Sequence, residues 1–168
     1  MERDIRKRNR EIEREIFRLV NNERKKRGLK ELQPKTYLIR AARRHSRYMI
    51  KRHRFAHTTK RGYEPWDRVK KSAKEDKSLS GLISRIFGIS TSPYVGENIA
   101  MMPMGKVKGM GNIRTEKDVA KAMVRNWMKS SGHRKNILNP TFTKIGIGVA
   151  CKKKHGHREY YATQDFQG

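Results

Sequence analysis

Two histidines and one glutamate stand in local contexts that suit metal or acid–base chemistry. His57 lies in "RFAHTT" and His133 in "SSGHRKN", each beside small or hydroxyl residues at the expected end of a helix. Glu97 lies inside the apolar segment "VGENIA", where a carboxylate must be paired, hydrogen-bonded or coordinated. Two neutral imidazoles and a carboxylate suit Zn²⁺ or another divalent metal, with one position open for water. Spacing alone does not establish that these three segments converge.

The other four histidines have simpler interpretations. His45 falls on the apolar face of an expected helix, which is typical of a core histidine. His53 lies among lysines and arginines, which repel metal cations. His155 and His157 belong to the lysine-rich segment "KKKHGH", and a solvated hairpin tip is the favoured interpretation there over a metal site.

Three amphipathic helices are expected in the segments around these residues. The first ends near Gly28, the second follows Pro34, and the third opens with a capping box formed by Thr115 and Asp118. Their apolar stripes are Ile5, Ile12, Ile16, Leu19 and Val20; Leu38, Ala41, Ala42, His45 and Met49; and Val119, Met123, Val124 and Trp127.

Two strands are expected late in the chain. "KIGIGVAC" places Ile145, Ile147, Val149 and Cys151 on one face and Gly146, Gly148 and Ala150 on the other. A glycine face predicts the close approach of another backbone, such as a helix lying across the sheet. "REYYATQDF" forms the second strand, and "YVGENIAMM" reads as a short strand or a buried turn. Early helices and a late antiparallel sheet favour an α+β fold.

The rest of the chain contains little regular pattern. We expect residues 1–168 to form a single domain, with a long irregular excursion at about residues 60–93 that contains one short helix near residues 79–87. "MPMGKVKGMGN" reads as a loop, and "SSGH" as a turn in which Gly132 reverses the chain.

The composition is strongly basic. Lys and Arg total 42 against 16 Asp and Glu, for a net charge of +26, so the chain should be attracted to polyanions. The charge is spread along the chain, and no nucleic-acid-binding motif accompanies it, so any binding to nucleic acid would be non-specific. The single cysteine, Cys151, excludes an intramolecular disulfide. The chain contains neither a membrane-spanning run nor a signal peptide, so it is expected to be either intracellular or a mature form.

Four ordered motifs resemble those of the CAP superfamily (cysteine-rich secretory proteins, antigens and pathogenesis-related proteins), and in particular its prokaryotic SCP-like domains. They are "RFAHTT", "VGENIA", "NWMKSSGHRKNILNPTFTKIGIGVA" and "YYATQDF". The resemblance extends from about residue 12 to residue 166. It implies an α-β-α sandwich with a central antiparallel sheet of three or four strands.

The resemblance also implies a site. Family members line a central cleft with two histidines and two acids, and several bind a divalent metal, often zinc, through the histidines. By motif, the histidines are His57 and His133, and Glu97 is the first acid, either as a metal ligand or as a hydrogen-bond acceptor that fixes one imidazole. The position of the second acid holds Ser130 here. We expect Ser130, Asn136 and Gln164 on the cleft wall.

Three functions follow as hypotheses. The first is a binding module for a lipid, an envelope component or a protein partner, with a weak Zn²⁺ site. The second is a metal-assisted hydrolase that uses His57, His133 and Glu97. The third is an electrostatic polyanion-binding protein. We expect a monomer, and by resemblance a secreted or extracytoplasmic one, with the cytoplasm as the alternative. A non-enzymatic role is favoured.

Overall fold

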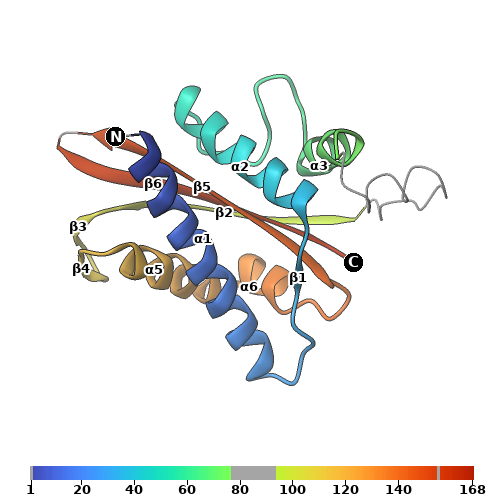
Figure 1. Cartoon of the computed structure of the whole chain (residues 1–168). Helices are drawn as coiled ribbons and strands as arrows, with labels where there is room; N and C mark the ends of the chain where they lie inside the picture. Colours follow the sequence, from blue (N-terminus) through green and yellow to red (C-terminus); the bar gives the residue numbers. More distant parts are fainter. Residues whose placement is uncertain (1, 77–93, 155) are drawn as a thin grey trace.

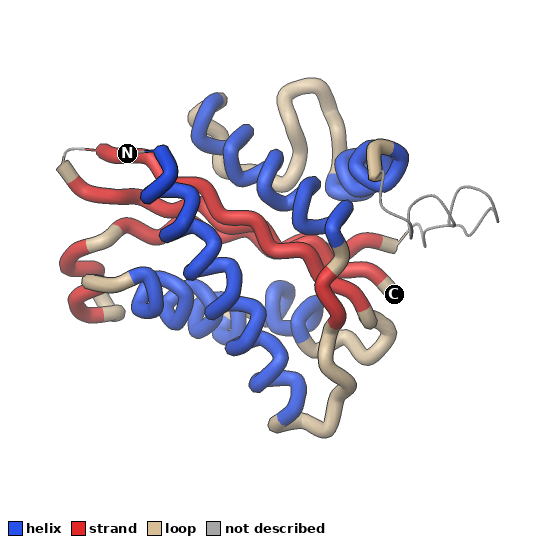
Figure 2. Tube along the Cα trace, in the orientation of Figure 1, coloured by secondary structure: helices blue, strands red, loops and turns tan. Residues whose placement is uncertain are grey.

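The computed structural model describes residues 2–76, 94–154 and 156–168 and has three layers (Figures 1 and 2). A central sheet separates two groups of helices. One group consists of α2 (Thr36–Lys51) and α3 (Pro65–Lys74), and the other of α1 (Glu2–Lys25), α5 (Glu116–Lys129) and α6 (Ser131–Ile137). This is the α-β-α sandwich that the resemblance implied.

The sheet has four strands in the order β1-β5-β6-β2. The strands are β1 (Gln33–Pro34), β2 (Val95–Pro103), β5 (Lys144–Lys154) and β6 (His157–Gln167). β2, β6 and β5 are antiparallel, as predicted. β1 runs parallel to β5, so the sheet is mixed. The parallel strand arises because the segment between α1 and α2 passes along β5, where the Gln33 amide donates to the Thr143 carbonyl at 2.9 Å.

The glycine face of β5 lies against α2, as the sequence predicted. A Cβ atom at Gly146 would lie 2.1 Å from the carbonyl carbon of Leu38, and one at Gly148 would lie 2.1 Å from the amide nitrogen of Arg43. Real Cβ atoms essentially never approach backbone so closely. The two glycines therefore set the distance between α2 and the sheet.

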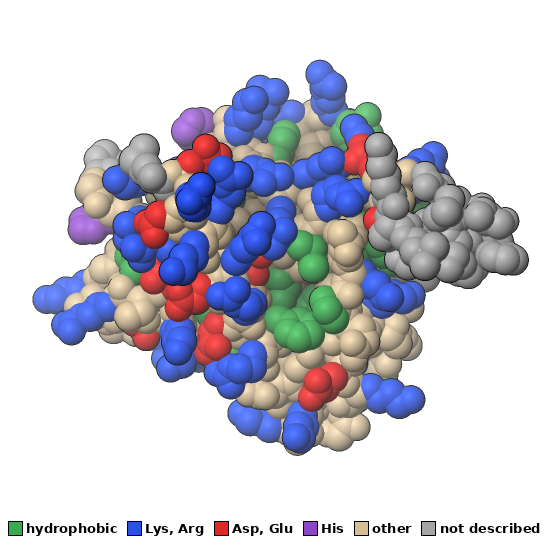
Figure 3. All heavy atoms as spheres, in the orientation of Figure 1, with side chains coloured by type: hydrophobic (Ala, Val, Ile, Leu, Met, Phe, Trp, Pro, Cys, Tyr) green, Lys and Arg blue, Asp and Glu red, His purple; other side chains and the backbone are tan. Residues whose placement is uncertain are grey.

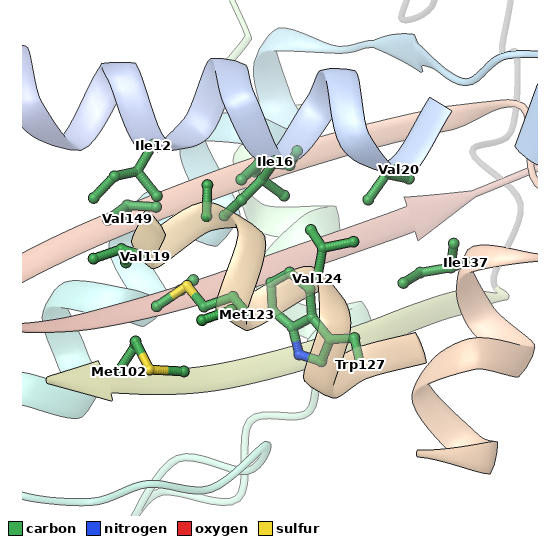
Figure 4. Close-up of a cluster of buried hydrophobic side chains, with 14 of the residues drawn as sticks. Ile12, Ile16, Val20, Met102, Val119, Met123, Val124, Trp127, Ile137 and Val149 are labelled. Carbon is green, nitrogen blue, oxygen red and sulfur yellow. The ribbon is translucent and has the colours of Figure 1, made fainter. Parts of the chain in front are cut away.

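The main core lies on the other face of the sheet, between α1, α5 and the strands. Figure 4 shows the apolar stripe of α1 directed toward α5 and the sheet. The stripes predicted for α1 and α5 account for much of this cluster, whose members include Ile12, Ile16, Val20, Val119, Met123, Val124 and Trp127. All seven are buried, which confirms the periodicity from which the helices were predicted.

Three local predictions were wrong. α3 occupies part of the stretch expected to be irregular; it begins with Pro65 at its first turn and a capping box between Glu64 and Asp67. The segment expected to be a loop contains a hairpin of β3 (Gly105–Val107) and β4 (Gly111–Ile113). The expected turn around Gly132 is the first turn of α6, and that glycine does not adopt a positive φ. The short helix expected near residues 79–87 lies outside the described residues.

Candidate functional site

The loop between α2 and α3 brings His57 to Glu97 on β2. The Nδ1 atom of His57 lies 2.8 Å from Oε1 of Glu97. The side chain of Glu97 is 1% exposed, whereas that of His57 is 47% exposed. An ionised carboxylate only accepts hydrogen bonds, so Nδ1 of a neutral His57 carries the proton and Nε2 keeps its lone pair. The buried acid thus fixes the tautomer of a solvent-reachable imidazole.

Arg68 of α3 is the second partner of Glu97. Its Nη2 atom donates to Oε2 of Glu97, and its Nη1 atom donates to the carbonyls of His57 at 2.7 Å and Tyr63 at 3.1 Å. Burial raises the pKa of Glu97, but the hydrogen bond with His57 and the charge of Arg68 outweigh it and hold that pKa below its usual value. Arg68 was not among the site residues predicted from the sequence. Glu64 followed by Pro65 is a typical helix start and could have predicted α3. It does not predict the ion pair between Arg68 and Glu97.

Asp165 of β6 is a second acid beside Glu97, and it was not among the predicted site residues. It is the cross-strand partner of Glu97 and is fully buried. Burial and the adjacent Glu97 carboxylate raise the pKa of Asp165 well above its usual value, which favours the neutral acid. The residue belongs to the motif "YYATQDF", but its contact with Glu97 depends on the pairing of two distant strands.

His45 lies behind His57 and is fully buried, as a core histidine should be. Its Nε2 atom is 3.0 Å from the carbonyl of Ala56 and 3.9 Å from Oε1 of Glu97. Burial lowers the pKa of His45 to about 4, so the ring is neutral at physiological pH. Its contact with Ala56 anchors α2 to the residue preceding His57.

His133 reaches the same strand from α6. Its carbonyl accepts a hydrogen bond from Nδ2 of Asn98 on β2 at 3.1 Å. Burial lowers the pKa of His133, and the nearby His57 lowers it further. The two imidazoles are thus close enough to interact electrostatically, although they come from opposite sides of β2. Ser130, the residue expected on the cleft wall, is the N-cap of α6 and is partly exposed.

An amide network supports this edge of the sheet. Asn136 donates from Nδ2 to the Glu97 carbonyl at 3.2 Å and to Oδ1 of Asn98 at 2.9 Å. Asn98 donates in turn to Oε1 of Gln164 at 3.1 Å. Asn136 is partly exposed, but Gln164, which was also expected on the cleft wall, is fully buried and does not reach solvent. Trp127 closes the edge further, because its Nε1 donates to the Ile99 carbonyl at 3.0 Å.

Comparison with known proteins decides the family. The model of the CAP cysteine-rich secretory protein family matches residues 17–166. The chain belongs to this family. It is also 39% identical over 136 residues to YkwD of Bacillus subtilis, a match that covers 81% of this chain and 41% of YkwD.

Solved structures with the same fold come from several bacteria. An extracellular protein of Bacillus anthracis with an SCP domain superposes with a TM-score of 0.68 at 24% identity, over 95% of this chain and 41% of that one. An outer surface protein of Borrelia burgdorferi gives a TM-score of 0.62 at 17% identity, over 94% of both chains. The CAP domain thus spans less than half of YkwD and of the Bacillus anthracis protein.

The donor set of this CAP domain fits a divalent metal only in part. Within the described residues, no three His, Cys, Asp or Glu side chains are grouped so that they could hold an ion. Glu97 already pairs with His57 and Arg68, and the Arg68 guanidinium opposes a second cation beside it. The groups that remain are Nε2 of His57 and the imidazole of His133, two ligands where a structural zinc site has four.

Among the described residues, no helix combines the length and the apolar composition that a bilayer crossing requires.

Proposed function

We propose that this CAP domain is a non-enzymatic binding module that acts outside the cytoplasm, with a ligand site at the edge of β2 where His57 and His133 approach each other. The observation that carries the proposal is the engagement of Glu97. Its Oε1 atom contacts His57 and its Oε2 atom contacts Arg68, and its side chain is almost fully buried. The carboxylate therefore positions His57.

The same observation argues against the hydrolase hypothesis. A general base must be within reach of the proton that it removes, and both oxygens of Glu97 are occupied. Asp165 is fully buried and favours its neutral form, so it cannot replace Glu97 as the base. Binding a ligand needs only the solvent-reachable groups of the site, which are Nε2 of His57 and the imidazole of His133.

Zinc is the divalent metal that the exposed donors suit best. Nε2 of His57 and the imidazole of His133 would hold the ion, and Glu97 would keep His57 in the correct tautomer. Zinc supplies Lewis acidity toward oxygen or nitrogen groups of a ligand. Two protein ligands predict weak, reversible binding on which folding does not depend.

The structural relatives support a location outside the cytoplasm, and the positive net charge of the protein supports an anionic ligand. The structural relatives named above include one protein described as extracellular and one described as an outer surface protein. Lys and Arg side chains cover much of the face in Figure 3, with fewer acids among them, and the net charge is +26. An anionic polymer of the cell envelope is therefore the favoured partner. Its binding should weaken steeply with salt, which titration of polyglutamate at increasing NaCl concentrations measures.

A lipid ligand has weaker support. A pocket of about 250 Å³ lies between α1, α2 and β5, with Phe17, Ile39 and Ile145 among its apolar walls. Its volume is below the roughly 300–1,000 Å³ typical of small-molecule sites. Its apolar walls would accept no more than a short hydrocarbon segment.

Calorimetric titration with ZnCl₂ tests the histidine site. His57→Ala and His133→Ala should each abolish binding, while His157→Ala, a change at the exposed hairpin, should leave it intact. Affinity should fall as pH drops below about 6.5, because burial holds the pKa of His133 below that value and protonated imidazole cannot coordinate a metal. His133→Ala should keep the apo-protein stability within about 1 kcal/mol, whereas His57→Ala removes a hydrogen bond from the buried Glu97 and should cost about 1–3 kcal/mol. Unchanged zinc affinity in His133→Ala would refute the proposed site.

A further inference from the structure

A second pocket lies at the end of α2, on the part of the 52–64 loop beyond His57. Its volume is about 430 Å³, which is within the range of small-molecule sites. Six residues line it: Tyr48, Arg52, Thr59, Lys60, Arg61 and Tyr63. It does not include the histidine site, and neither His57 nor His133 lines it.

This pocket is positively charged, and no acidic side chain among its lining residues neutralises it. Arg52, Lys60 and Arg61 supply three cations, and the lining contains no Asp or Glu. Many arginines elsewhere are paired with carboxylates, as Arg43 is with Glu13. Within the described part of the chain, no ion pair involves any of the three pocket cations. The pocket is therefore suited to an anion.

The hydroxyl groups of the pocket add donors. The Tyr48 hydroxyl accepts a hydrogen bond from the Lys60 amide at 2.6 Å. The Thr59 hydroxyl accepts one from the Tyr63 amide at 3.0 Å. Each hydroxyl accepts one hydrogen bond from a backbone amide and keeps its own proton to donate. With the three cations, the polar side chains of the pocket thus offer donors to a ligand.

The wall that carries these groups is formed before any ligand arrives. The Thr59 amide donates to the Tyr63 carbonyl at 3.1 Å, and the Gly62 amide donates to the Thr59 carbonyl at 3.0 Å. Gly62 has a φ of 78°, which favours glycine at this turn. Arg68 also donates to the Tyr63 carbonyl, which ties the turn to α3. A preformed wall lowers the entropy cost of binding.

We propose that this pocket binds a phosphorylated sugar unit. Five donor groups exceed what the two oxygens of a carboxylate accept well, whereas a phosphate monoester presents three terminal oxygens and up to two charges. The volume exceeds the needs of a lone ion, and the ring of Tyr63, which is 53% exposed, offers an apolar face to a sugar ring. The site goes beyond the proposed histidine site and needs no metal.

Calorimetry in the presence of EDTA tests the ligand class independently of the histidine site. The probes are glucose 6-phosphate, glucuronate, inorganic phosphate and glucose. We expect glucose 6-phosphate to bind at least about tenfold more tightly than each of the other three, because only it engages both the donors and the tyrosine face. Equal affinity for inorganic phosphate would overturn the sugar assignment, and equal or tighter binding of glucuronate would overturn the phosphate assignment.

Paired charge variants test the location. Lys60→Gln combined with Arg61→Gln should weaken glucose 6-phosphate binding at least about tenfold. The matched control is Lys121→Gln combined with Arg125→Gln, two exposed residues of α5 whose replacement changes the net charge equally. The control should retain affinity within about twofold, since it leaves every contact of the pocket intact. An equal loss in the control would show that overall charge, and not this pocket, holds the ligand. Tyr63→Ala should weaken glucose 6-phosphate binding but not that of inorganic phosphate, and an equal loss for both probes would also overturn the assignment.

Discussion

Glu97 and Asp165 are cross-strand partners on β2 and β6, and both carboxyl groups are buried on the same face of the sheet. Their environments shift the pKa values of the two carboxyl groups in opposite directions. Glu97 is engaged by His57 and Arg68 and has a lowered pKa, whereas the pKa of Asp165 is raised by burial and by the neighbouring Glu97 charge. One acid is thus held ionised and the other is held neutral, which is how two adjacent carboxyls can be buried together.

Replacing Asp165 by Asn should therefore stabilise the protein at pH 7. Burial and the Glu97 charge raise the pKa of Asp165 and so penalise its ionised form in the fold; neutral Asn avoids this penalty, so we expect a higher free energy of unfolding. Because the folded-state pKa is raised, the stability of the wild type increases as pH falls toward the unfolded value, and the advantage of Asn should shrink. Urea unfolding at pH 7 and pH 4.5 measures both effects. A loss of stability at pH 7 would mean that Asp165 is ionised in the fold.

His45 should make the protein less stable in mild acid. Burial lowers its pKa from 6.5 to about 4, so between these values the unfolded chain binds a proton that the folded chain does not. Stability should fall as pH drops through this window, by roughly 3 kcal/mol in total, and this contribution should level off below pH 4. His45→Gln keeps a donor for the Ala56 carbonyl but does not titrate. Its urea midpoints should depend less on pH than those of the wild type, and parallel profiles would contradict the assignment.

Arg68→Met should destabilise the fold by about 3–5 kcal/mol, because it leaves the buried Glu97 without its cation. Lys71→Met, at an exposed position of the same helix, should change stability by no more than about 0.5 kcal/mol. Adding Glu97→Gln to Arg68→Met should recover part of the loss, since the uncompensated charge is then gone. Denaturant unfolding of the wild type, Arg68→Met, Glu97→Gln and the double variant forms a double-mutant cycle. Additive losses would show that the two residues act independently.

Two glycines should respond to alanine in opposite directions. Gly148→Ala would place a Cβ atom 2.1 Å from the backbone of α2, so we expect a loss of about 3 kcal/mol or more, or failure to fold. Gly132→Ala adds a methyl group in open space within α6 and should stabilise the protein by about 0.5–1 kcal/mol. Thermal melting of the two variants makes the comparison. A tolerated Gly148→Ala would mean that α2 can move away from the sheet.

The sequence by itself determined the features that depend on local pattern. Apolar residues at helical spacing identified α1, α2 and α5, and Thr115 with Asp118 identified the start of α5. Alternation of glycine with larger apolar residues in β5 predicted a helix across its face, and α2 lies there. The isolated acid in "VGENIA" predicted that Glu97 must be paired, although it could not name Arg68. These signals succeed because they rest on periodicity, capping and burial along one segment.

Only the tertiary structure decided which residues surround Glu97. Arg68 comes from a helix in a polar stretch with little periodicity, and Asp165 faces Glu97 because of the register between β2 and β6. α6 has seven residues and β3 and β4 have three each, which is too short to show a period, so the sequence predicts only a turn and a loop there. The opposite pKa shifts of the two acids likewise depend on burial depth and on charges brought from other segments. A linear pattern contains neither the burial depth nor the neighbouring charges, because both arise only when distant parts of the chain pack together.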